Sequence, residues 1–226
     1  MKNLIATFLL SVISFGVFSQ NFTYSEDYPK YYKLSKIQDD PNFYESLRSR
    51  FNEEGENFTK KEVIRLLIGQ TAQESYNAYG MVGLERSFLA TDQVSPDTLL
   101  KYGKLVYEMN PVDLSVNYGL WKANSKIINE QETKKYEARF KLIAESILST
   151  GDGSKERPYF VISPIDGYVL ITKYYEKEIG TMGSGEDAKG YFLDILEMVD
   201  APDNKTLHFV IDHGMGGLSK ILSEIE

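Results

Sequence analysis

Cysteine is absent from this 226-residue sequence. Disulfides, thiolate metal sites and a cysteine nucleophile are therefore excluded, and so is the lipid-modified cysteine of a bacterial lipoprotein. Tryptophan occurs once and histidine only twice. Few residues are therefore available for a histidine-dependent catalytic triad or a zinc site. The net charge is −8, with no basic stripe, which argues against nucleic acid as a partner.

The first residues, MKNLIATFLLSVISFGVFSQ, have the pattern of a secretory signal. Lys2 supplies the positive start, an apolar run follows from Leu4 to Phe18, and short side chains precede Gln20. The run is shorter than the roughly 20 apolar residues of a membrane-spanning helix. We expect residues 1–19 to be a signal peptide cleaved near Ser19-Gln20. The product would be periplasmic or secreted, with no transmembrane segment after processing.

Residues from about 40 to 150 have a helical period. Capping residues indicate four helix starts: Asp40-Pro41, Thr59 with Glu62, Ser95-Pro96, and Asn129 with Glu132. The segment LVYEMNPVDLSVNYGLWKA is similar to the junction between two tetratricopeptide-type units. This half therefore predicts an array of α-α hairpins.

After Gly153 the period changes to that of strands, over about residues 157–226. Four runs rich in β-branched and aromatic residues predict strands: PYFVIS, YVLITKYY, YFLDILEMV and TLHFVID. PIDG is expected to be a turn and GTMGSGEDAKG a loop. Such short connections predict an antiparallel meander, followed by a short helix from Leu218 to Ile225. The sequence thus predicts a single α+β domain from residue 20 to 226.

Both histidines lie in the stretch LHFVIDHGMGG. In a regular strand His208 and His213 point to opposite faces, and His208 lies roughly 13 Å from Asp212. We expect a strand end with solvent-facing or edge histidines and no metal site. The GDGSKE segment, with Asp152, Ser154 and Glu156 at alternate positions, fits a turn better than a calcium loop.

No other motif indicates a cofactor or a catalytic residue. The glycines of GTMGSGEDAKG lie between predicted strands, whereas a phosphate-binding loop opens a helix. Ser184 in the same stretch lacks the second glycine of a nucleophile elbow. The catalytic residues of any enzyme in this chain stay unknown from the sequence, and no cofactor is expected.

Aromatic residues are the most suggestive feature for binding, because tyrosine and tryptophan give large contacts at low entropy cost. A groove between the helix hairpins would take an extended ligand, and its candidate anchors are Tyr76, Tyr79, Tyr118 and Trp121. Each could instead serve core packing, Trp121 above all. The prediction is a non-catalytic binding or scaffolding module for a peptide, protein or glycan of the cell envelope. The alternative is an envelope hydrolase acting on glycans or peptides through carboxylates, which needs a cleft with two convergent acids, one with a raised pKa.

Five segments in this order resemble a family of secreted bacterial domains of unknown function: YPKYYKLSKIQDDPNFYESLRSRFN, FTKKEVIRLLIGQTAQESYNAYG, NPVDL, GDGSKERPYFVIS and LHFVID. The resemblance covers nearly all of the chain after the signal. It implies a helical, tetratricopeptide-like half followed by a small antiparallel sheet, and it implies no activity. The family pattern has more tyrosines where this chain has residues 66–69, and no histidines in the last strand, so the resemblance gives His208 and His213 no role.

Overall fold

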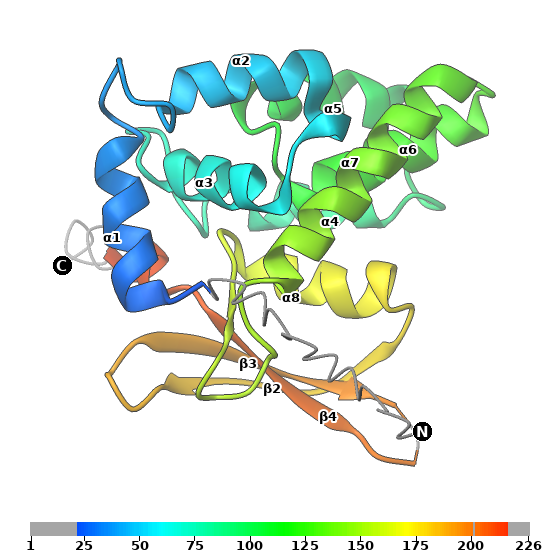
Figure 1. The fold of residues 1–226 in the computed structure, drawn as a ribbon. Coiled ribbons are helices and arrows are strands. Elements are labelled where there is room, and N and C mark those ends of the chain that lie inside the picture. Colours follow the sequence, from blue (N-terminus) through cyan, green and yellow to red (C-terminus); the bar gives the residue numbers. More distant parts are fainter. Residues whose placement is uncertain (1–21, 201, 217–226) are drawn as a thin grey trace, which may run out of the picture.

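The computed structural model describes residues 22–200 and 202–216. Helices form one layer of the molecule, and a small sheet lies against it (Figure 1). The predicted signal peptide and the predicted helix from Leu218 to Ile225 lie outside the described residues. Within them the chain has the α+β architecture that the sequence predicts.

The helical half runs from the N-terminal side of the chain to residue 148. Its helices are α1 (Tyr24–Leu34), α2 (Tyr44–Glu54), the short η1 (Gly55–Asn57), α3 (Lys60–Thr71), α4 (Val82–Leu89), α5 (Pro96–Met109), α6 (Leu114–Lys126) and α7 (Glu130–Leu148). Helices α5, α6 and α7 pack consecutively as hairpins, and α4 packs on α6. The predicted hairpin array is therefore present in this part of the fold.

Three of the four predicted helix starts are confirmed. Thr59 forms a capping box with Glu62, and the side chains of Ser95 and Asn129 accept hydrogen bonds from the first turns of α5 and α7. The start at Asp40 was wrong, because α2 begins at Tyr44. Asp40 instead accepts a hydrogen bond from the Asn42 N–H at 2.7 Å, which closes a turn.

The sheet contains β1 (Tyr159–Phe160), β2 (Glu178–Glu186), β3 (Phe192–Val199) and β4 (Lys205–Val210) in the order β1-β4-β3-β2. The β2–β3 and β3–β4 pairs are antiparallel, as predicted, but β1 pairs with β4 in parallel. The sheet is therefore mixed. The parallel pair is possible because a long connection, which includes β2 and β3, separates β1 from β4.

Two assignments in this half were wrong. The segment YVLITKYY, predicted as a strand, is helical: α8 covers Pro164–Val169 and a π-helical turn, η2, covers Leu170–Tyr174. The reason is the capping box of Ser163 and Asp166, which begins a helix inside the supposed turn PIDG. Conversely, most of the glycine-rich stretch predicted as a loop belongs to β2, because pairing with β3 overrides its weak strand propensity.

One continuous set of buried apolar side chains joins the two halves. It includes Leu67 of α3, Ile143 of α7, Phe160 of β1 and Phe209 of β4. Helices α4 and α6 also pack directly on α8. The junction between the helical layer and α8 is therefore a fixed part of the fold, and it is where a polar cavity lies.

Candidate acidic site

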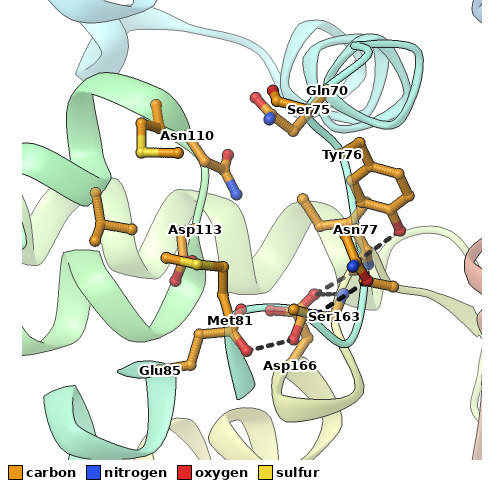
Figure 2. A pocket seen from close by; sticks show the side chains of 15 residues that line it. Gln70, Ser75, Tyr76, Asn77, Met81, Glu85, Asn110, Asp113, Ser163 and Asp166 are labelled. Carbon is orange, nitrogen blue, oxygen red and sulfur yellow. Dashed lines mark hydrogen bonds between the residues drawn. The ribbon is translucent and has the colours of Figure 1, made fainter. Parts of the chain in front are cut away.

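A cavity of about 160 Å³ lies at this junction. Its lining comes from the end of α3 and the segment that follows it, from α4, from the end of α5 and its connection to α6, and from the start of α8 (Figure 2). Three of the lining side chains are carboxyl groups on separate elements: Glu85, Asp113 and Asp166. Each of these residues is no more than 5% exposed.

Local capping positions two of the three acids. Asp113 precedes α6, and its Oδ1 accepts hydrogen bonds from the Val116 N–H at 3.0 Å and the Ser115 hydroxyl at 2.7 Å. Asp166 is in the first turn of α8, and its Oδ2 accepts from the N–H groups of Ile162 and Ser163 at 3.0 and 2.9 Å. Both acids thus satisfy orphan donors at or beside helix N-termini.

Glu85 connects the two capped acids. Its Oε2 accepts a hydrogen bond from the Ser163 hydroxyl at 2.8 Å, and its carboxyl group lies beside that of Asp113, close enough for the two to share a proton. Because two carboxylates cannot bond each other without a proton, the pair holds one between them.

Burial sets the protonation of this cluster. It raises the pKa of Glu85 and of Asp113, and the neighbouring acids raise the pKa of Glu85 further. The proton of the pair lies on Glu85, because the hydrogen bonds that Asp113 accepts from the Ser115 hydroxyl and the Val116 N–H favour the charged form of Asp113. Burial, with the charge of Asp113, also raises the pKa of Asp166 to about 7. The interactions within this site therefore do not fully offset the cost of burying an ionised carboxyl group.

The rest of the lining supplies no compensating positive charge. None of the described residues that line the cavity is basic. The polar ones include Gln70, Ser75 and Asn77, and the buried Asn110 Oδ1 has no hydrogen-bond partner among the described residues. Buried carboxyl groups are normally paired with a cation. This cavity is thus rich in hydrogen-bond acceptors and lacks a counter-charge of its own.

A glycine in α6 allows α4 to carry Glu85 to this position. A Cβ atom on Gly119 would lie 2.9 Å from the Cβ of Phe88 and 3.1 Å from its carbonyl oxygen. We expect Gly119→Ala to destabilise the protein by roughly 1–3 kcal/mol, because this overlap outweighs the better helix propensity of alanine. Urea denaturation measures the change. Gly83→Ala is the matched control, because a Cβ atom there meets nothing within 4 Å, and it should not destabilise the protein. Equal effects of the two changes would show that the packing of α4 does not depend on Gly119.

The structure places the four predicted aromatic anchors in different surroundings. Tyr76 lines the acidic cavity, and its hydroxyl donates to the Ile162 carbonyl at 2.8 Å. Tyr79 is half-buried and its hydroxyl lies 3.6 Å from Met215 Sδ. Tyr118 and Trp121 form a different pair on α6, with ring centroids 5.9 Å apart. Both rings of this pair also pack on Phe140 of α7.

The expectation of solvent-facing or edge histidines was wrong for His213. Strand β4 ends at residue 210, residues 212–216 are helical, and the imidazole packs among the rings of Tyr28, Tyr76 and Phe160. Burial lowers the pKa of His213 to about 3, which keeps the ring neutral at physiological pH. His208 is half-buried, and its Nδ1 hydrogen bonds to the Gly153 carbonyl at 3.1 Å.

Across residues 22–200 and 202–216, no group of three or more His, Cys, Asp or Glu side chains is arranged to hold a metal ion. Asp152 bonds the Ser154 N–H at 3.0 Å, as the turn interpretation predicts. In the same part of the chain, no helix has the length and apolarity to cross a membrane.

Sequence reasoning missed Glu85, Asp113 and Asp166 as site residues. Two weak signals were present: Asp113 lies in the NPVDL motif before a predicted helix, and Ser163 with Asp166 has capping-box spacing. Nothing distinguished Glu85 among the 33 acidic residues of the sequence. The cluster is visible only after folding brings the three elements together.

The fold and the cavity define an α+β domain with a buried acidic site between its helical layer and α8. The family described as "Domain of unknown function (DUF4919)" matches residues 33–213. The chain belongs to this family, and the predicted resemblance to a domain of unknown function is confirmed. No curated protein and no solved structure matches the chain.

Proposed function

We propose that this DUF4919 protein is a binding module of the bacterial envelope, and that its acidic cavity takes a positively charged amino or guanidinium group of its ligand. The pattern of residues 1–19 supports export. Tyr76, one of the predicted anchors, lines the same cavity. The ligand classes compatible with this chemistry are a peptide, a protein or an amino sugar.

The observation that carries the proposal is a cavity lined by three buried carboxyl groups and by no basic residue among those described. Holding acids in such a place costs free energy unless a partner compensates them. A cationic ligand supplies the missing counter-charge. Its N–H groups also supply donors to acceptors of the site such as Asn110 Oδ1, which has no partner among the described residues.

An organic cation fits better than a metal ion. The carboxyl oxygens are already engaged by Ser115, Ser163 and backbone N–H groups, and the described residues form no metal-binding group. Ammonium and guanidinium groups need fewer and more widely spaced acceptors than a metal coordination shell, because each N–H bonds separately.

Hydrolysis of peptides is the second candidate, favoured by the proton shared between Glu85 and Asp113. Two acids that share one proton are the arrangement of an aspartic-protease dyad. The same contact disfavours glycoside hydrolysis by this pair, since glycosidase carboxyl groups stand roughly 5–9.5 Å apart. Binding ranks first because both acids are held by hydrogen bonds within the protein.

Calorimetric titration with Nα-acetyl-lysine amide tests the proposal. We expect it to bind at least tenfold more tightly than its neutral Nε-acetylated form at pH 7.5, because only the charged form compensates the carboxyl groups. Equal affinities, or no binding of lysine, arginine and glucosamine probes, would overturn cation recognition. Cleavage of a peptide library that is lost in Asp113→Asn would instead establish the second candidate.

A further inference from the structure

An apolar stripe lies on the exposed side of α5. Tyr102, Leu105 and Met109 are 47%, 53% and 58% exposed, and their spacing of three and four residues places them on one face of the helix. Single exposed apolar residues are ordinary on protein surfaces, whereas a row of three large ones marks a contact surface more often.

The stripe leads directly to the acidic cavity. Met109 belongs to both, since it also lines the cavity. Its neighbours in the lining, Val106 and Asn110, come from the same end of α5, and Asp113 follows in the connection to α6. An elongated ligand with its charged group in the cavity would therefore continue over Met109 toward Leu105 and Tyr102.

Resting on the proposed cation binding, we infer that the ligand is a polypeptide segment with a lysine or arginine side chain in the cavity and apolar side chains on the α5 stripe. Met109 lies seven positions after Tyr102 on the helix, a rise of about 10 Å. An extended peptide covers this distance with roughly three residues. The apolar side chains should thus lie within three positions of the basic residue.

The charged residues beside the stripe further restrict the kind of polypeptide segment that can bind there. Lys101 and Lys104 of α5 are exposed, and the Lys101 ammonium lies 5.4 Å from the centroid of the Tyr102 ring. Additional basic residues in the ligand would be repelled there. Glu108, exposed on the same flank of α5, offsets one of these two charges, and the remaining positive charge disfavours a polybasic segment.

Fluorescence anisotropy with three labelled probes tests this inference: labelled lysine amide, a Gly-Ser-Gly-Lys peptide and a Leu-Ala-Leu-Lys peptide. We expect the leucine peptide to bind at least tenfold more tightly than the Gly-Ser peptide. The double variant Tyr102→Ser with Leu105→Ser should remove this gain. Ile128→Ser, which removes a side chain that is 83% exposed on the connection between α6 and α7, is the control and should keep the gain.

The outcomes separate this inference from the proposed function. If lysine amide binds but the leucine peptide gains nothing, or if the double variant keeps the gain, the peptide inference is wrong and cation binding stands. If no probe binds, both proposals fail. Analytical ultracentrifugation of the same proteins tests whether a second copy of the chain covers the stripe. If the wild type is a dimer and the double variant is a monomer, the stripe is a dimer interface and the peptide assignment is wrong.

Discussion

Replacing Glu85 by glutamine is expected to stabilise the protein by roughly 2–3 kcal/mol at pH 7. Glutamine preserves the shape of the side chain and can make the same polar contacts. Its carbonyl oxygen still accepts from the Ser163 hydroxyl, and its amide N–H donates to Asp113 in place of the carboxyl proton. What the change removes is the cost of protonating Glu85 on folding.

The direction of this effect follows from the raised pKa of Glu85. The folded state retains its proton while the unfolded chain releases it above its ordinary pKa of 4.5. The stability of the wild type therefore falls as pH rises from that value toward the raised pKa. Near pH 4 both states are protonated, and the benefit of glutamine should vanish. Asp166, with a pKa of about 7, adds a similar fall between about pH 4 and 7 that persists in the variant.

Urea denaturation of wild type and Glu85→Gln at pH 4, 5.5 and 7 measures this effect. Glu74→Gln is the matched control, because it makes the same change of side chain at an exposed position in the neighbouring segment and should change stability by less than about 0.5 kcal/mol. A destabilised Glu85→Gln at pH 7 would mean that Glu85 is ionised in the folded protein, and the description of the pair as sharing a proton would be wrong.

Local sequence signals predicted the helical half well, because its helix starts depend on neighbouring residues. The capping box at Thr59 and the caps at Ser95 and Asn129 required no tertiary information. Residues 168–175 were misassigned because a short apolar run fits a strand and a buried helix equally. The cap at Ser163 decides in favour of the helix, but its segment PIDG also fits a turn.

The candidate site was beyond sequence reasoning for a different reason. Glu85, Asp113 and Asp166 are separated by 28 and 53 positions, and α4, α6 and α8 come together through the core. No spacing rule connects them. Tyr76 was identified by its type alone, and the structure places it in the lining of the cavity, whereas Tyr118 and Trp121 pack against α7.

The cost of the acid cluster is itself an argument for a role in binding. Glutamine or asparagine could make the same capping and bridging contacts without titration, so the structural duties of these residues do not require acids. Proteins retain such local costs chiefly where function needs them. A carboxyl group at Glu85 offers one property that glutamine lacks: it can give up its proton and become a counter-ion.

The affinity for an amine should therefore rise with pH, by up to tenfold per unit between pH 5 and 8. An ammonium group in the cavity favours the ionised pair and so displaces the proton that Glu85 shares with Asp113. Below the raised pKa of Glu85, each unit of pH makes that release cheaper by about 1.4 kcal/mol. The amine itself stays protonated throughout this range, so the slope reports the site.

Calorimetric titrations of Nα-acetyl-lysine amide across this range measure the slope, and repeating them in buffers of different ionisation enthalpy counts the protons released. Asp194→Asn is the control, because burial also raises the pKa of Asp194 to about 6, yet Asp194 is not among the residues lining the cavity. Its loss should leave the slope intact. In Glu85→Gln the affinity should fall at least a hundredfold at pH 8 and no longer vary with pH through this group. An unchanged slope in that variant would assign the released proton to Asp113 or Asp166 and not to Glu85, because burial raises the pKa of both of these remaining acids in the lining.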